Sequence, residues 1–168
     1  MTTIDYLNAA SVDAFVAEIG FAFEDSPWIA RVAAAQRPFA SRDELHAAMV
    51  AAVAAASDFD RVALIRAHPD LAGRVAREGR LTAASATEQA GAGLAALTPE
   101  EIERFDRDNG AYRANFGFPF VICARENTKA TILAALAARR DNDRATEIAT
   151  ALAEIAKIAR LRIEDAVT

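Results

Sequence analysis

The stretch IAKIARLRIEDAV, residues 155–167, completes the helical pattern that decides the fold class. Apolar residues precede and enter it at intervals of three or four, which is the spacing of one helix face: Ile148, Leu152, Ile155 and Ala159. The same spacing continues onto Arg162, which lies roughly 20° from Ile155 around a helix that turns by about 100° per residue. We predict one long helix from about residue 143 to 167, with Arg162 directed inward.

Two interpretations of an inward Arg162 follow from its chemistry. Its aliphatic stem can pack while the guanidinium reaches past the helix end into water. Alternatively, the guanidinium is buried as a clamp for an anion or a carbonyl, because a buried arginine needs a partner.

Upstream of this helix, cap signals and apolar periodicity predict further helices. The SRDE sequence at 41–44 and the TPEE sequence from Thr98 are capping boxes, and Pro69 should end a helix at His68 because α geometry is disfavoured before proline. We expect helices to begin near Ser11, Pro27, Ser41, Asp58, Thr82 or Ser85, Thr98 and Thr128.

The segment FPFVICA, residues 118–124, breaks the helical pattern because it is short and rich in aromatic and β-branched residues. We expect it to be buried and extended. No second strand and no internal repeat is evident, so the prediction is an all-α fold: a compact single-domain bundle of about eight helices over residues 1–168, with one short extended segment at 118–124.

Composition narrows the function classes. The 168 residues are 53% hydrophobic, carry a net charge of −5 and show no basic stripe, which argues against nucleic-acid binding. No apolar run approaches the roughly 20 residues of a membrane span, and the N-terminus has no signal-peptide pattern. The single cysteine, Cys123, excludes a disulfide within the chain and a cysteine-based zinc site.

His68 stands at the predicted end of a helix, before Pro69. A histidine there can simply hydrogen-bond a terminal carbonyl. However, the negative end of the helix dipole favours the imidazolium form, which can donate a proton, so His68 is also a candidate general acid.

Ser85 and Glu88 have capping-box spacing, which is one explanation for both residues. If Thr82 is the cap instead, Ser85, Glu88 and Gln89 share one helix face and present a hydroxyl, a carboxylate and an amide together. Cys123 could be a nucleophile paired with His68, but a small buried thiol is the simpler interpretation.

Four segments together resemble one protein family: HPDLAG (68–73), LTAASATEQAGAGL (81–94), FGFPFVICAR (116–125) and IAKIARLRIEDAV (155–167). They are similar to the 2-oxo-4-hydroxy-4-carboxy-5-ureidoimidazoline (OHCU) decarboxylases of urate degradation. The resemblance covers nearly the whole chain and implies an all-helical enzyme without a cofactor, which converts OHCU into (S)-allantoin and carbon dioxide.

The same resemblance implies roles for individual residues. His68 corresponds to the family's proton donor, and Glu88 and Arg162 complete the implied catalytic set. The implied substrate-binding residues are Pro69, Ser85, Gln89, Phe120, Val121, Ile122, Cys123 and Ala124.

The resulting expectation is a cytoplasmic enzyme whose partner is its small-molecule substrate, with no metal, nucleic acid or membrane involved; a homodimer would be compatible with it. The ending DAVT is not a peroxisomal address of the SKL type. Two alternatives stay open: a non-catalytic helical protein that binds a ureide or acts as a scaffold, and a Cys123/His68 hydrolase.

Overall fold

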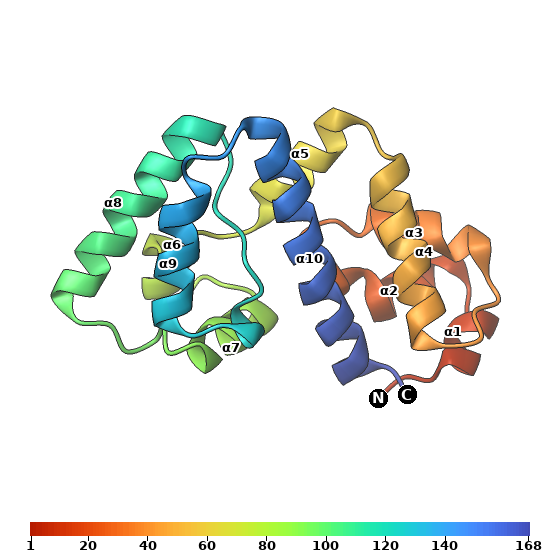
Figure 1. The fold of residues 1–168 in the computed structure, drawn as a ribbon. Helices are drawn as coiled ribbons and strands as arrows, with labels where there is room; N and C mark the ends of the chain where they lie inside the picture. The colour runs from red at the N-terminus through yellow and green to blue at the C-terminus, as the bar shows by residue number, and fades with distance from the viewer. The chain divides into compact units, whose positions relative to one another are not determined.

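The computed structural model describes residues 1–168, apart from the side chain of Val75. Ten α-helices and three 3₁₀ helices span the described residues (Figure 1). In chain order they are α1 (Ile4–Ala9), α2 (Val12–Ile19), η1 (Gly20–Ala22), α3 (Trp28–Ala33), η2 (Ala34–Gln36), α4 (Arg42–Ala55), α5 (Asp58–Ala67), α6 (Arg74–Arg77), α7 (Ala83–Gly91), α8 (Pro99–Phe116), η3 (Ala124–Glu126), α9 (Lys129–Arg139) and α10 (Arg144–Ala166). The expected all-α class is confirmed.

Local capping explains where most of these helices begin. The side chains of Ser11, Ser41, Thr98 and Thr128 each accept a hydrogen bond from a backbone N–H in the first turn of the helix that follows. At α8 the capping box is complete, because Glu101 also accepts from the N–H of Thr98 at 2.9 Å. These contacts satisfy N–H groups that have no partner within the helix, so the predicted helix starts are confirmed.

Two short helices were not predicted. Helix α1 precedes the first predicted helix, and α6 lies between the predicted helix end at His68 and the predicted helix start at Thr82.

The chain forms two compact units. The first unit contains residues Met1–Ala67 and Ala156–Thr168, and the second contains His68–Ile155. Helix α10 therefore contributes its first half to the second unit and its second half to the first. The expectation of one domain over residues 1–168 stays a prediction.

The two termini meet within the first unit (Figure 1). Thr2 and Val167 form an isolated parallel β-bridge, in which the N–H of Thr2 donates to the carbonyl of Ala166 and the N–H of Thr168 donates to that of Thr2. Large side chains of this unit are fully buried around α2, α3 and α4, among them Phe15, Ile29 and Met49.

The second unit is built around aromatic side chains from α8 and from the segment that follows it. Tyr112 meets Phe116 and Phe120 with ring centroids 4.6 and 5.4 Å apart. Gly117 ends α8 with φ at 77°, a conformation that glycine adopts without steric cost. Residues 118–123 then run buried and without regular structure to η3, which begins at Ala124, so the expected buried extended segment is confirmed except for its last residue.

None of the helices that the structure describes combines the length and the apolarity needed to cross a membrane.

Candidate active site

His68 lies directly after α5, as the sequence predicted. The helix ends at Ala67 because the residue before Pro69 is disfavoured in α geometry and Pro69 has no N–H to continue the hydrogen bonding. The His68 side chain is buried, with 6% of its surface exposed. An imidazole at this depth can act on a bound small molecule while remaining shielded from bulk water.

The turn that follows His68 depends on a glycine and on an unusual backbone conformation. Gly73 donates from its N–H to the carbonyl of Asp70 at 3.2 Å, and Ala72 adopts a left-handed φ of 54°. A Cβ at position 73 would lie 2.8 Å from the Cβ of Asp70, closer than carbon atoms tolerate. The glycine of the HPDLAG segment is therefore a steric requirement of the turn.

Helix α7 is capped by Thr82, whose hydroxyl accepts from the N–H of Ser85 at 3.3 Å. Because Thr82 is the cap, the interpretation of Ser85 and Glu88 as a capping box is wrong. Ser85 and Gln89 are both 5% exposed, and Glu88 is half-buried. The cap at Thr82 agrees with the alternative interpretation, and the face that Ser85, Glu88 and Gln89 share is turned toward the protein.

Gln89 links α7 to the turn after His68. Its Oε1 accepts a hydrogen bond from the N–H of Ala72 at 2.9 Å. This bond satisfies a backbone donor in a residue that is 2% exposed, where an unmade hydrogen bond would be costly.

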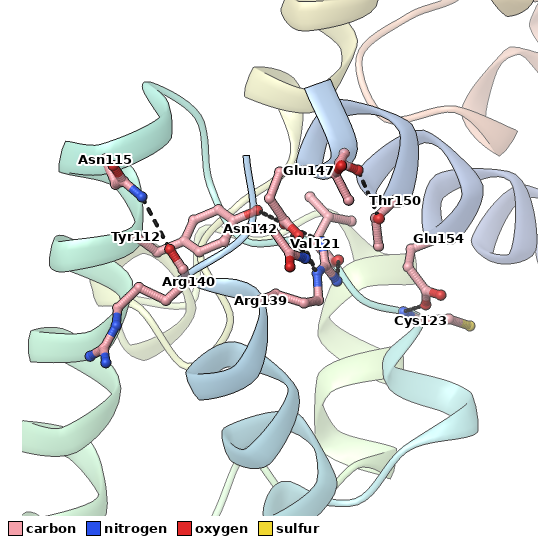
Figure 2. A network of polar contacts seen from close by, with 11 residues as sticks. Tyr112, Asn115, Val121, Cys123, Arg139, Arg140, Asn142, Glu147, Thr150 and Glu154 are labelled. Atoms are coloured by element: carbon pink, nitrogen blue, oxygen red, sulfur yellow. Dashed lines mark hydrogen bonds and ion pairs between the residues drawn. The ribbon is translucent and has the colours of Figure 1, made fainter. Parts of the chain in front are cut away.

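The extended segment 118–124 is held through its backbone by surrounding side chains (Figure 2). Arg139 donates to the carbonyl of Val121 at 2.8 Å, and Glu154 accepts from the N–H of Cys123 at 2.8 Å. Asn127 donates to the carbonyl of Cys123 at 2.9 Å. These contacts hold the chain extended without a neighbouring strand.

Beneath this segment lies a buried polar network that the sequence analysis missed (Figure 2). Glu147 is fully buried, forms an ion pair with Arg139 at 2.9 Å and accepts hydrogen bonds from the hydroxyl of Tyr112 and, at 2.8 Å, from Asn142. Burial, reinforced by the hydrogen bond to Glu147, raises the pKa of Tyr112 above its usual range. The network fixes Arg139, and Arg139 in turn fixes the carbonyl of Val121.

Cys123 is 1% exposed, and burial raises the pKa of its thiol. The nucleophilic form of cysteine is the thiolate, so this environment is unfavourable for a Cys123 nucleophile. The structure therefore favours the buried-thiol interpretation of Cys123.

The second unit thus brings together three of the predicted elements. Gln89 connects α7 to the turn after His68, and α7 packs against η3, which begins where the segment 120–124 ends. Within this unit, α7 therefore contacts both the turn that follows His68 and η3, which follows the extended segment.

Arg162 belongs to the first unit, and its side chain is only 4% exposed. Its Nη1 lies 2.9 Å from Oε2 of Glu24, which is also 4% exposed, and donates to the carbonyl of Phe21 at 3.3 Å. The interpretation in which the guanidinium reaches past the helix end into water is therefore wrong, and the predicted inward direction is confirmed. Glu24 was not predicted, although a carboxylate in the apolar sequence FAFEDSP is an unusual signal.

A cavity of about 310 Å³ lies on one side of Gln89. Its walls are mainly alanine and leucine side chains from the region 72–95, and its polar members are Arg77 and Gln89. His68, Ser85 and Glu88 do not line it. Gln89 is the one predicted site residue that lines this cavity.

The chain is similar to known proteins in sequence and in fold. The chain matches the OHCU decarboxylase family over residues 8–164. It is 42% identical over 163 residues to a 2-oxo-4-hydroxy-4-carboxy-5-ureidoimidazoline decarboxylase of Haloferax volcanii, covering 97% of this chain and 95% of the relative. An enzyme of the same name from Amia calva is 40% identical over 159 residues, covering 95% of this chain and 91% of the relative.

A solved structure is similar over the whole chain. The crystal structure of (S)-allantoin synthase superposes with a TM-score of 0.79 at 30% sequence identity, covering 100% of this chain and 54% of that chain. Together with the match of the family over 8–164, these relatives show that the chain belongs to the OHCU decarboxylase family.

Proposed function

We propose that this protein decarboxylates OHCU to (S)-allantoin in urate degradation, with His68 as the proton donor and without a cofactor. Family membership makes the chain a carboxy-lyase. The assignment of His68 rests on its position. Its imidazole is buried at the end of a helix and is followed by a turn whose conformation depends on Gly73 and Gln89.

In this decarboxylation the substrate itself accepts the electron pair, so the protein has to place only charged and proton-donating groups around it. Cleavage of the bond between the ring carbon and the carboxylate releases carbon dioxide and leaves an electron pair on that carbon. The pair moves into the conjugated imidazoline as a double bond to the neighbouring ring carbon, which carries the ureido group. A proton delivered to that neighbouring carbon, with loss of the hydroxyl proton to form the ring carbonyl, completes the reaction. A donor fixed on one face of the ring would yield one enantiomer.

We assign the proton delivery to His68. Glu88 is assigned to hydrogen-bond or deprotonate the substrate hydroxyl and to hold His68. Arg162 is assigned to the oxygen on which negative charge grows. A guanidinium bound tightly to the departing carboxylate would stabilise the ground state more than the transition state, and so would slow the reaction. A cation directed at the developing oxyanion acts in the productive direction.

The remaining predicted residues form the proposed substrate contacts: Pro69, Ser85, Gln89, Phe120, Val121, Ile122, Cys123 and Ala124. Of the backbone groups in the segment 120–124, the N–H of Cys123 is already engaged by Glu154, the carbonyl of Val121 by Arg139, and the carbonyls of Cys123 and Ala124 by Asn127. The segment therefore offers the substrate its other backbone groups. Operation as a homodimer and a cytoplasmic location stay predictions.

The direct test mixes freshly generated OHCU with the purified protein and follows the circular-dichroism signal of (S)-allantoin. The spontaneous reaction is slow and gives a racemate, so its product contributes no net signal. We expect rapid appearance of the (S)-enantiomer. Binding of a ureide without acceleration would instead support a non-catalytic ureide-binding protein.

Glu88→Gln separates chemistry from helix structure. Because Thr82 caps α7, a glutamine at position 88 leaves the start of the helix intact. We expect normal helix content and a lower turnover number. Wild-type turnover in Glu88→Gln would remove the carboxylate from the proposed mechanism.

A further inference from the structure

The turn from Pro69 to Gly73 is held on several sides by polar side chains of the second unit. Besides Gln89 at the N–H of Ala72, Arg77 donates to the carbonyl of Ala72 at 2.7 Å. Arg113 lies 2.9 Å from the carboxylate of Asp70, and Asn109 donates from Nδ2 to the carbonyl of Leu71 at 2.9 Å. Three consecutive residues of the turn are thereby fixed from outside it.

One face of α8 provides most of this support. Asp106, Asn109 and Arg113 are spaced by three and four residues, so they share one side of the helix. Asp106 accepts two hydrogen bonds from Arg77, at 3.0 Å each, and so holds the guanidinium that contacts Ala72. This face of α8 therefore supports the turn that follows His68.

Asn109 is the buried member of this face. It is 5% exposed, whereas the Arg113–Asp70 and Arg77–Asp106 pairs are partly exposed to water. Leu71 is 7% exposed, so its carbonyl depends on the amide of Asn109 for a hydrogen bond. Loss of that donor would leave a buried acceptor unsatisfied.

The Oδ1 atom of Asn109 indicates that the side chain acts in this turn as a hydrogen-bond donor. Within the described residues, the buried Oδ1 of Asn109 has no hydrogen-bond partner. Rotating the amide would place Oδ1 against the carbonyl of Leu71, two acceptors facing each other. The unsatisfied Oδ1 of Asn109 lowers the stability of the protein. A functional role of Asn109 in holding the turn would explain why this cost is present.

We infer that Asn109 is a positioning residue for proton transfer: by holding the carbonyl of Leu71, it fixes the turn that orients His68. The inference rests on the proposed role of His68 as proton donor. Asn109 does not touch the substrate; it acts through the backbone between Leu71 and His68. Its loss should therefore affect the chemical step and not substrate binding.

The test compares Asn109→Ala with Asn115→Ala in the 168-residue protein. Asn115 lies on the same helix and also donates through Nδ2 to a backbone carbonyl, that of Arg140 at 3.1 Å, but the bond is exposed and lies outside the turn (Figure 2). Asn109→Asp provides a second variant, which preserves the size of the side chain and replaces the donor by an acceptor. For each folded variant, kcat, KM and the enantiomer ratio of the allantoin are measured after subtraction of the spontaneous reaction.

We expect kcat of Asn109→Ala and Asn109→Asp to fall by about 10- to 100-fold, because small displacements of a reacting group are costly. KM should change little, the excess of (S)-allantoin should decrease, and Asn115→Ala should behave as wild type. Wild-type kcat and enantiomer ratio in either Asn109 variant, or equal losses in Asn109→Ala and Asn115→Ala, would overturn the inference. Inactivity of the wild-type protein toward OHCU would instead contradict the proposed function, so the two failures are distinguishable.

Discussion

Arg162 and Glu24 form an ion pair that is almost completely removed from water, with Nη1 and Oε2 separated by 2.9 Å. The two residues come from opposite ends of the chain, yet both lie in the first unit. Removing either charge alone from water is unfavourable, and the attraction between the two charges offsets part of this desolvation cost. Glu24 therefore helps to place a guanidinium on an apolar helix face.

Removing Glu24 should destabilise the protein and displace Arg162. We expect Glu24→Ala to lower the free energy of unfolding by about 3–5 kcal/mol, because it leaves a buried charge without its carboxylate. The matched control is Asp13→Ala, which removes an exposed ion pair with Arg31 in the same unit and should cost less than about 1 kcal/mol. Urea unfolding measures both, and equal losses in the two variants would contradict a structural role for the buried pair.

Much of the helical architecture was predictable because its signals are local. Ser11, Ser41, Thr98 and Thr128 cap the helices that their neighbouring residues predict, and Pro69 ends α5 as expected. The inward direction of Arg162 was also predictable, since it follows from helical periodicity alone.

The partners of these residues were not predictable, because they depend on contacts between segments far apart in the sequence. Asn109 and Glu147 carry no local pattern that distinguishes them from surface residues, and the apolar neighbours of Glu24 indicate burial without naming its partner. The choice between Thr82 and Ser85 as the cap of α7 needed the structure for a different reason: both residues satisfy the same short-range rule.

Gly73→Ala tests whether the turn after His68 requires glycine. Its Cβ would lie 2.8 Å from Asp70 Cβ and 3.1 Å from the carbonyl oxygen of Asp70, so the turn must shift. We expect a loss of about 1–3 kcal/mol in stability, typical of overpacking, together with a lower kcat.

Gly110→Ala serves as the control for this change. A Cβ at position 110, in the middle of α8, meets nothing within 4 Å, so alanine should stabilise the helix by about 0.5–1 kcal/mol. Thermal unfolding should move the two variants in opposite directions. A Gly73→Ala protein as stable and as active as wild type would show that the turn tolerates a side chain.

The raised pKa of Tyr112 predicts a dependence of stability on alkaline pH. The folded protein favours the protonated phenol, whereas Tyr112 in the unfolded chain should titrate near pH 10. Its contribution is therefore fully present below pH 10 and is lost as pH rises beyond it, by up to about 1.4 kcal/mol per pH unit.

Urea unfolding between pH 8 and 11 measures this effect. Tyr112→Phe should show a shallower decline above pH 10 than wild type, and Tyr6→Phe, at a tyrosine that is 49% exposed, should decline as wild type does. If wild type and Tyr112→Phe declined in parallel, the buried phenol would not be the titrating group.

Cys123→Ser tests the hydrolase alternative. The thiol is buried and its pKa is raised, so it should remain protonated and should not act as a nucleophile at neutral pH. We expect near-normal turnover, measured by the circular-dichroism assay with OHCU. Abolished turnover in a folded Cys123→Ser protein would instead restore the cysteine as a catalytic candidate.

The most direct measurement of the central claim is turnover of OHCU by His68→Asn, with the enantiomer ratio of the allantoin followed by circular dichroism. Asparagine can fill part of the imidazole's space but cannot deliver a proton as a general acid. The account predicts a folded protein whose kcat falls on the order of 10²- to 10⁴-fold, with loss of the excess of (S)-allantoin. A folded His68→Asn protein that produces (S)-allantoin at the wild-type rate would contradict it.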